Sequence, residues 1–597
     1  MKKISLFLIS VALLTLTGFS QPLSGTKTIP GDYATIALAI TDLNTQGVTA
    51  PGVTFDVSPG YTETFANATD GIITATGTTP NDAIVFQRNG IGVNPVITAG
   101  VGTSTTDAII KIAGGNYITF NGISLQENPA NITGTTQMEY GYFISNASAI
   151  NGAQNNIIKN CTITLNRANT TSKAVYQYVF TTPTNATGAN SNNKYQFITV
   201  ENSYNGIQLT GNATYPDLSS EVSNCIVGAN SPDDIGNGSS TLSALRLTSS
   251  QDAFVFNNTV RNATITGGIK LYGIFLENVK GNSQVYNNRV YNIRSTSTST
   301  SAILYGIRLD VPSGFQGAAY NNIIYGFSHG INTPSATIVC RPLAINVTGT
   351  GTVGISYNTV NVNLNANASV TAVYIIRGTV EITNNIFANY SASGATSKRY
   401  CILKGGAATI TSNYNDFYIA AGTNNFVGYY TTDQTTLTDW QTASTQDANS
   451  VNVNPLFLGA DDLHPSNPAL NNLGTPVPVT VDIDGVARDA ATPDMGAYEF
   501  VPASCPQPSL LTANAITNNS ASLGWTSNGS ETQWNIEVGL SGFVPTGTPT
   551  NSGVTNPFTV IGLLGNTSYS YYVQADCGGG STSIWAGPFT FTTLCDP

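Results

Sequence analysis

Four copies of a short phrase carry the side chains best suited to chemistry. In chain order they are Gly206-Ile-Gln-Leu209, Ala244-Leu-Arg-Leu247, Gly273-Ile-Phe-Leu276 and Gly306-Ile-Arg-Leu309. If each copy is a strand, strict alternation turns its second and fourth residues to one face and its third to the other. The opposite face then carries Gln208, Arg246, Phe275 and Arg308, with Thr210, Thr248, Glu277 and Asp310 beside them.

This row of side chains is compatible with three interpretations. An aromatic ring between two arginines, next to carboxylates, is suited to holding a sugar chain or an acidic glycan. Glu277 and Asp310 on neighbouring coils are expected about 5 Å apart, near the separation of the carboxylates in retaining glycosidases. Alternatively, Arg246 and Arg308 simply neutralise Glu277 and Asp310 on a solvated face, and no ligand is involved.

A second repeated phrase predicts the fold that would bring this row together. The phrase N-N-x-[IV] occurs at Asn257-Asn258-Thr259-Val260, Asn287-Asn288-Arg289-Val290, Asn321-Asn322-Ile323-Ile324 and Asn384-Asn385-Ile386-Phe387, with looser copies around Asn160, Asn224, Asn358 and Asn415. Successive copies mostly lie about 22 to 38 residues apart, a period typical of solenoids. Short alternating strands without helices between them favour a parallel β-helix over a β-propeller, whose blade signature is missing.

The asparagines themselves are expected to be structural. Asn tolerates the left-handed backbone of a tight corner, and stacked Asn amides can form a hydrogen-bonded ladder. At the N-terminal end of the solenoid, Asp32 is expected to cap a helix over residues 33–45 whose apolar face covers the first coil. A strand over 53–57 follows, so residues 21–60 are predicted to form an N-terminal cap.

The composition argues against nucleic-acid binding, and the first residues predict export. The 597 residues carry 22 Lys and Arg against 33 Asp and Glu, a net charge of −11, and only 9% are charged. A chain without a basic stripe is not expected to bind nucleic acid. Lys2 and Lys3 precede an apolar run over 4–16, which predicts a signal peptide over 1–20, cleaved after Ser20. No later apolar run approaches the roughly 20 residues of a membrane span, so we expect a secreted protein without membrane insertion.

Two segments carry a family resemblance that brackets residues 25–500. Gly31-Asp32-Tyr33-Ala34-Thr35 with Leu43-Asn44-Thr45-Gln46-Gly47-Val48 resembles the start of secreted right-handed β-helix proteins of the pectin-lyase-like fold from Bacteroidetes-type bacteria. Asn454-Pro455-Leu456-Phe457 and Pro493-Asp494-Met495-Gly496-Ala497-Tyr498-Glu499 resemble their closing module, expected here over 432–500, which commonly precedes a cell-surface anchor. The resemblance implies a β-helix over 21–500, and this fold serves enzymes and non-enzymes alike.

Residues 501–597 resemble a fibronectin type III module. The resemblance makes Trp525 a core residue and Tyr569 a tyrosine corner, and it places Cys505 and Cys577 at one pole of the sandwich, where a disulfide is predicted. Cys595-Asp-Pro597 repeats the opening phrase Cys505-Pro506, as if another module began there. We therefore expect a chain truncated at Pro597, and a missing C-terminal region read by type IX-like secretion machinery.

Metal and cofactor chemistry is weakly indicated. Asp482 and Asp484 could begin a calcium loop, but the ligand pattern is incomplete, and Arg488 is a nearby partner for the carboxylates. Arg488 is expected to lock the closing coil through ion pairs with Asp494 and Glu499. No other metal site and no cofactor are predicted. Cys161 and Cys225 are expected to be stacked core residues, and Cys340 and Cys401 are expected to be either the same or a pair.

The sequence as a whole favours an exported adhesin or glycan-binding protein of the cell surface, with a polysaccharide or surface glycan as its partner and no catalysis. The alternative is a polysaccharide lyase or glycoside hydrolase acting on the same face, with Glu277 and Asp310 as its catalytic residues. A passive structural stalk is the third hypothesis, and it requires no site.

Overall fold

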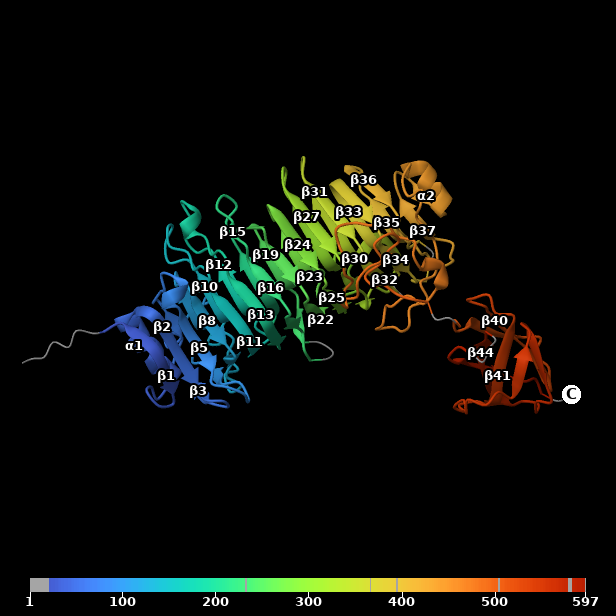
Figure 1. The fold of residues 1–597 in the computed structure, drawn as a ribbon, viewed down its shortest axis with the longest axis horizontal. Helices are drawn as coiled ribbons and strands as arrows, with labels where there is room; N and C mark the ends of the chain where they lie inside the picture. The colour runs from blue at the N-terminus through green and yellow to red at the C-terminus, as the bar shows by residue number, and fades with distance from the viewer. Residues whose placement is uncertain are drawn as a thin grey trace, which may run out of the picture.

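The computed structural model describes residues 21–230, 234–364, 367–392, 396–502, 505–577 and 582–595. The predicted signal peptide over 1–20 and the chain end at Pro597 lie outside these ranges. The described chain is all-β: a parallel β-solenoid of about 12 turns, followed by two antiparallel sheets (Figure 1). Its parallel strand pairing excludes the β-propeller considered above. In the described ranges, no helix has both the length and the apolar character needed to cross a membrane.

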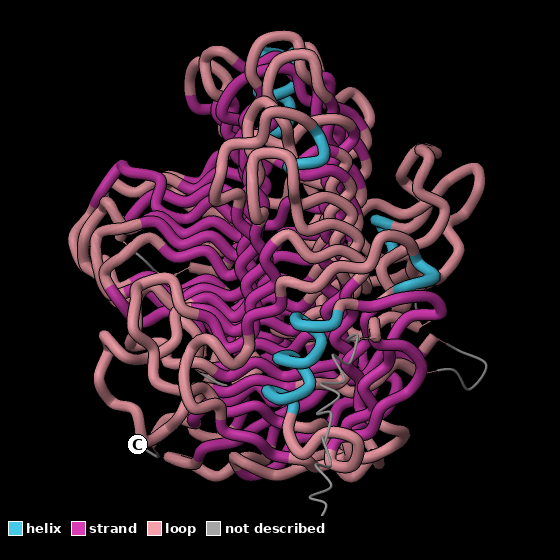
Figure 2. The backbone as a smooth tube through the Cα atoms, turned by 90° about the vertical axis from the view of Figure 1, so that its left-hand side faces the viewer, coloured by secondary structure: helices cyan, strands magenta, loops and turns pink. Residues whose placement is uncertain are grey.

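Successive turns place their strands on three faces, which we call faces 1, 2 and 3. Face 1 consists of β4 (Ile72–Ile73), β7 (Ala108–Ala113), β10 (Tyr140–Ser145), β12 (Lys173–Tyr178), β14 (Asn205–Thr210), β19 (Leu242–Thr248), β23 (Lys270–Glu277), β26 (Ile303–Val311), β30 (Ser335–Val347), the first part of β33 (Ala368–Thr383), β35 (Arg399–Lys404), β37 (Asn425–Tyr429) and the antiparallel β38 (Asp433–Gln434). Seen from the left-hand side of Figure 1, strands of successive turns lie one behind another (Figure 2).

Faces 2 and 3 continue from each other around a corner. Face 2 consists of β1 (Leu23–Ile29), β2 (Val48–Val57), β5 (Ile84–Arg88), β8 (Ile118–Asn121), the first parts of β11 (Ile157–Thr164) and β13 (Lys194–Glu201), β16 (Glu221–Ser223), β21 (Phe254–Phe256), β24 (Asn282–Tyr286), β27 (Gln316–Tyr320), β31 (Thr352–Ser356), the second part of β33 and β36 (Ala408–Asn413). Face 3 consists of β3 (Thr62–Thr64), β6 (Val96–Thr98), β9 (Ser124–Gln126), the second parts of β11 and β13, β17 (Ile226–Val227), β22 (Thr259–Ile265), β25 (Arg289–Ser295), β28 (Ile323–Ile324), β29 (Phe327–His329), β32 (Thr359–Val362) and β34 (Ile386–Asn389). Beside these, β18 (Ile235–Gly238) pairs with β22, and β15 (Asp217–Leu218) pairs with β20 (Ser250–Gln251).

The Asn-Asn pairs occupy the corner between faces 2 and 3, and their two members have different tasks. The first asparagine has a left-handed backbone, with φ of 54° at Asn287 and 52° at Asn321. The second is buried and joins the ladder: Asn288 Nδ2 donates to Asn322 Oδ1 at 3.0 Å, and Asn322 Nδ2 donates to Asn358 Oδ1 at 2.9 Å. The ladder runs through Asn258, Asn288, Asn322, Asn358, Asn385 and Asn415. The sequence predicted both roles for a single asparagine. In the structure, the first asparagine of each pair forms the left-handed corner, and the second forms the hydrogen-bonded ladder.

A helix at the N-terminal end covers the first coil. Helix α1 (Ile36–Gln46) lies across the end of the stack that faces the viewer in Figure 2, and its apolar side chains join the solenoid core. It is capped by Thr35, whose hydroxyl accepts a hydrogen bond from Leu38 N at 3.1 Å. The prediction that Asp32 caps this helix is wrong, because its carboxylate instead accepts from Thr28 N at 2.8 Å in the preceding turn.

The other end of the solenoid is followed by a segment that returns along its outer surface. Helix α2 (Leu437–Ser444) covers the last coils with the buried Trp440. The chain over 454–500, which we call the returning segment, then contacts earlier turns: Thr475 bonds to Asn384, Val481 to Asn321 and Ala497 to Thr359. Short 3-10 helices occur at Pro80–Asp82, Ala186–Gly188 and Pro468–Leu470.

The last described residues form two antiparallel sheets around their own core. One sheet contains β39 (Ser509–Asn514), β40 (Ser520–Thr526) and β43 (Phe558–Ile561), and the other contains β42 (Asn551–Val554), β41 (Gln533–Leu540), β44 (Ser568–Asp576) and β45 (Ala586–Thr592). Trp525 is buried in this core, and Tyr569 Oη accepts from Leu564 N at 2.9 Å. Cys505 and Cys577 form a disulfide, the pairing expected from the family resemblance.

Candidate functional site

Face 1 brings the four central residues of the predicted row into register. Gln208 pairs with Arg246, Arg246 with Phe275, and Phe275 with Arg308, one residue from each successive turn. The alternating apolar neighbours point inward and are fully buried: Ile207, Leu209, Leu245, Leu247, Ile274, Leu276, Ile307 and Leu309. Alternation and repeat spacing, both local properties, place this row on one outer surface.

The two arginines of the row form ion pairs with the two predicted carboxylates. Arg246 bonds to Glu277 on the next turn, and Glu277 also accepts from Thr248 Oγ1 at 3.1 Å. Arg308 bonds to Asp310 on its own strand through two contacts, of 2.8 Å from Nε and 2.7 Å from Nη2. Burial alone would lower the pKa of Arg308, but its hydrogen bonds to Asp310 and the charge of that carboxylate outweigh burial and raise it. Charge neutralisation, one of the three interpretations of the sequence, therefore describes both pairs.

Phe275 does not offer its ring to a ligand. It is only 4% exposed and packs with Tyr272, Tyr305 and Ala344 in a small apolar cluster on the outside of face 1. The ring stacks on Tyr272 with 4.5 Å between centroids, and the guanidinium carbon of Arg308 lies 5.0 Å from its centroid. Direct contact between Phe275 and a sugar, as the sequence suggested, is ruled out by this packing; the ring supports the arginines instead. Gln208 is similarly covered, at 9% exposed.

The row extends beyond the four residues that the phrases identified. The outer row on face 1 runs through Ile72, Lys111, Phe143, Tyr176, Gln208, Arg246, Phe275, Arg308, Ala344, Tyr374, Leu403 and Tyr429. A second row beside it includes Tyr140, Lys173, Tyr272, Tyr305 and Arg341. Both rows therefore contain cations and aromatic rings.

Lys173 is a half-buried cation of face 1. Its ammonium lies 4.4 Å from the centroid of Tyr176 and 4.9 Å from that of Tyr140, so that it covers both rings. Burial lowers the pKa of Lys173 to about 8, and the charge of Glu139 partly opposes this shift. At neutral pH the lysine is mainly protonated, and among the described residues no carboxylate forms a salt bridge with it.

Lys111 and Arg341 are further cations of face 1 that lie over aromatic rings. The ammonium of Lys111 lies 5.3 Å from the centroid of Phe143. The guanidinium of Arg341 lies 5.0 Å from that of Tyr374, and its Nη1 donates to Tyr305 Oη at 2.8 Å. Such cation–π contacts fix the position of a charge without neutralising it. Face 1 can therefore attract a polyanion at both ends of its neutralised centre.

The sequence contained a signal for these missed residues. The repeated phrase continues, with weaker similarity, as Gly141-Tyr-Phe-Ile144 and Ala174-Val-Tyr-Gln177 before the four copies, and as Ala372-Val-Tyr-Ile375 after them. Aligning these copies as well would have placed Phe143, Tyr176 and Tyr374 in the row. Lys173 and Arg341 precede the phrase. Their positions over neighbouring aromatic rings depend on side-chain packing between turns.

The carboxylates of the candidate calcium residues, Asp482 and Asp484, already form bonds to other protein groups. Asp482 accepts hydrogen bonds from the backbone N–H groups of Asp484 and Val486 at 2.9 and 2.8 Å, and from Glu499 N at 2.9 Å. Asp484 bonds to Arg289 at 2.7 Å and to His464 at 3.2 Å. Within the described ranges, no cluster of three or more His, Cys, Asp or Glu side chains has the arrangement of a metal site.

Comparison with known proteins adds little to this geometry. No protein-family model and no curated protein matches the chain. Among solved structures, a PL6 family alginate lyase, AlyGC, is similar to 66% of this chain at 11% sequence identity, with a TM-score of 0.26. The matched region spans 53% of the length of that lyase, about half.

Proposed function

We propose that this protein binds an acidic polysaccharide along face 1 and does so without chemical conversion. The observation that carries the proposal is Lys173, a cation held over the rings of Tyr140 and Tyr176 that has no salt-bridge partner among the described residues. Lys111 and Arg341 repeat this arrangement on other turns. Because turns are spaced about 4.8 Å apart, the charges follow the solenoid axis, as a linear polymer bound along it requires.

Binding of polygalacturonate to the full chain tests the proposal. In affinity electrophoresis, we expect polygalacturonate to retard the protein at low salt more than dextran does, and added salt to weaken the effect. Lys173→Gln should weaken retardation several-fold. Lys159→Gln is the matched control, because Lys159 precedes Lys173 on the same turn but belongs to face 2. Equal retardation by dextran, or equal loss in both variants, would contradict the proposal.

A second candidate function, β-elimination, is favoured by the pKa of Lys173. With a pKa of about 8, this amine is partly neutral in mildly alkaline solution and could remove the proton next to a uronate carboxylate. The bond to the leaving sugar oxygen would then break, that oxygen would take a proton from solvent, and a carbon–carbon double bond would form in the remaining ring. Ultraviolet absorbance of that unsaturated product distinguishes the two candidates: a rise that disappears in Lys173→Gln supports a lyase, and no rise supports binding alone.

The proposed setting is the cell exterior. We infer a signal peptide over 1–20, a right-handed β-helix over 21–500 with an N-terminal cap and a closing module, and a fibronectin type III-like domain over 501–597. The strand order of the two antiparallel sheets and the bond from Leu564 N to Tyr569 support the last assignment. The disulfide between Cys505 and Cys577 is compatible with an oxidising compartment. Display by type IX-like machinery, as an adhesin, completes this proposal.

A further inference from the structure

An aromatic stack on face 2 ends one turn before a surface pocket. Phe256, Tyr286 and Tyr320 lie in register on consecutive turns, with centroids 4.9 and 4.8 Å apart and planes within 6° of parallel. The next residue in register is Ser356. One face of the Tyr320 ring is therefore covered by Tyr286, and the other is turned toward a position that carries no ring.

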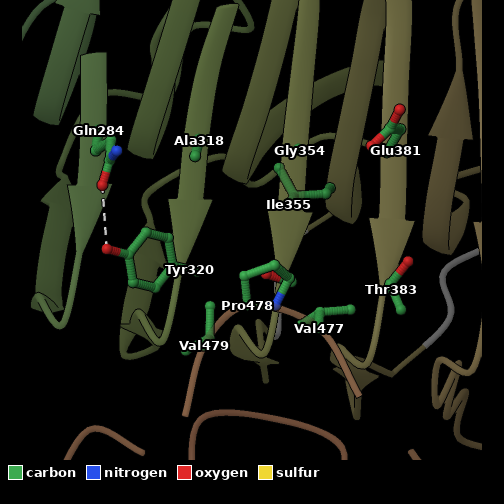
Figure 3. Close-up of a pocket in the computed structure, with 11 residues that line it drawn as sticks. Gln284, Ala318, Tyr320, Gly354, Ile355, Glu381, Thr383, Val477, Pro478 and Val479 are labelled. Carbon is green, nitrogen blue, oxygen red and sulfur yellow. Dashed lines mark hydrogen bonds between the residues drawn. The ribbon is translucent and has the colours of Figure 1, made fainter. Parts of the chain in front are cut away.

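The position after Tyr320 is an open pocket of about 330 Å³ (Figure 3). Its floor is Ala318, Gly354 and Ser356, and a Cβ atom added at Gly354 would meet nothing within 4 Å. Glu381 and Thr383, one turn further on, lie on the side opposite Tyr320. Because turns are about 4.8 Å apart, Tyr320 and Thr383 are roughly 10 Å apart, which leaves one turn's thickness for a ring.

The returning segment supplies the remaining wall, and it is fastened on both sides of the pocket. Val477, Pro478 and Val479 cross the open edge (Figure 3). Before them, Thr475 exchanges two hydrogen bonds with the Asn384 side chain, of 2.6 and 2.9 Å. After them, Val481 O accepts from Asn321 Nδ2 at 2.9 Å. The two corner asparagines thus hold the wall in place, and the pocket is formed before any ligand arrives.

The polar groups of the pocket are disposed around the free face of Tyr320. Gln284 Oε1 accepts from Tyr320 Oη at 3.1 Å, which orients both side chains and leaves the amide of Gln284 as a donor. Across the described chain, the carboxylate of Glu381 and the hydroxyls of Ser356 and Thr383 make no hydrogen bond to another protein group. A flat apolar ring is thus bordered by one carboxylate, one amide and two hydroxyls.

We propose that this pocket binds an uncharged pyranose ring of a saccharide. The sugar's C–H groups would stack on Tyr320 as the next member of the aromatic series. Its hydroxyls would donate to Glu381 and exchange hydrogen bonds with Ser356, Thr383 and Gln284. Glu381 repels acidic sugars, so the ligand class differs from that proposed for face 1, and this inference is independent of that function.

Saturation-transfer NMR on the full chain tests the site with methyl glucoside, methyl galactoside, methyl mannoside, galacturonate and choline as probes. We expect saturation transfer from the protein to at least one methyl pyranoside and no saturation transfer to galacturonate. Ser356→Tyr continues the aromatic stack into the pocket, so it should preserve the melting temperature and abolish transfer. Thr119→Tyr, on the same face near the other end of the solenoid, is the matched control and should leave transfer unchanged.

Glu381→Ala provides a second variant, because this exposed side chain contributes little to folding. It should weaken binding roughly tenfold, the loss expected for a hydrogen bond to a charged group. The proposal is overturned if no methyl pyranoside shows transfer, or if transfer persists in Ser356→Tyr. Transfer to choline but to no sugar also overturns it, because the pocket would then be a cation site.

Discussion

The guanidinium carbon of Arg488 lies over the ring of Tyr357, 3.7 Å from its centroid, and this contact joins the returning segment to the middle of the solenoid. Arg488 also donates to Asn321 Oδ1 at 2.9 Å and Gly496 O at 3.0 Å, and its Nη1 lies 3.5 Å from Glu499. Burial lowers the pKa of Arg488, although the nearby acidic groups oppose the shift. The predicted lock thus exists, but Asp494 contributes its backbone carbonyl rather than its carboxylate.

Replacing Arg488 should release the returning segment. We expect Arg488→Leu to cost about 3 kcal/mol, because Glu499 then loses its buried partner. Arg488→Lys should rescue little, since an ammonium lacks the planar fork that faces Tyr357. Limited proteolysis between residues 454 and 500 is the measurement, with Arg167→Lys, on a loop outside this segment, as the control. Unchanged cleavage in Arg488→Leu would show that other contacts hold the segment.

The two members of an Asn-Asn pair should differ in how strongly their substitution lowers the stability of the fold. Asn288→Ala removes buried bonds to Val255 O and Asn322 Oδ1, and it takes away the acceptor that Asn288 Oδ1 offers to both Asn258 N and Asn258 Nδ2, so we expect a loss of about 2–3 kcal/mol. Asn287→Gly should change stability little, because glycine readily adopts the observed φ of 54°. Denaturant unfolding of both variants measures the difference. Equal losses would contradict this division, because the first asparagine would then contribute more than its left-handed backbone.

Removing a carboxylate from face 1 should strengthen its binding to a polyanion. In Glu277→Gln, Arg246 loses its ionic partner, so we expect retardation by polygalacturonate to increase a few-fold at low salt. Asp310→Asn should act in the same direction by releasing Arg308. A glycosidase that used Glu277 and Asp310 would instead lose turnover in these variants, and reducing-sugar release measures this directly. Weaker binding in both variants would contradict the proposed role of face 1.

Stability should fall as the pH rises through the weakly acidic range. Burial raises the pKa of Asp217 to about 7, despite its hydrogen bonds from Gln177 and Asn190. In the unfolded chain this carboxyl ionises near pH 4, so between about pH 4 and 7 the folded state holds the extra proton. By linkage, that contribution is fully present below pH 4 and lost by about pH 7.

Asp217→Asn checks the direction of this effect. The variant cannot ionise at this position, so its melting temperature should decline less than that of the parent protein between pH 4.5 and about pH 7.5. Asp70→Asn, at an exposed turn, is the control and should preserve the parent's slope. A steeper decline in Asp217→Asn would mean that the charged form is the one stabilised by the fold.

Local pattern determined the solenoid and the direction of its side chains. The period of the Asn phrases and the lack of helices between them predicted parallel coils, and alternation predicted that Arg246, Phe275 and Arg308 share an outer surface. Each of these properties depends only on neighbours along a strand and on the spacing of equivalent positions. The start of α1 was missed because Asp32 and Thr35 are both good capping residues, and their hydrogen-bond partners decide between them.

What covers those side chains was decided by the tertiary structure alone. Phe275 points outward as predicted, yet it is buried because Tyr272, Tyr305 and two arginines close over it. The open face of Tyr320 likewise becomes a pocket only because Val477 and Pro478, remote in sequence, cross beside it. The amino-acid sequence sets the direction of a side chain through short-range periodicity. The exposure of that side chain depends on which distant segments pack against it. The sequence pattern of a single strand does not predict that packing.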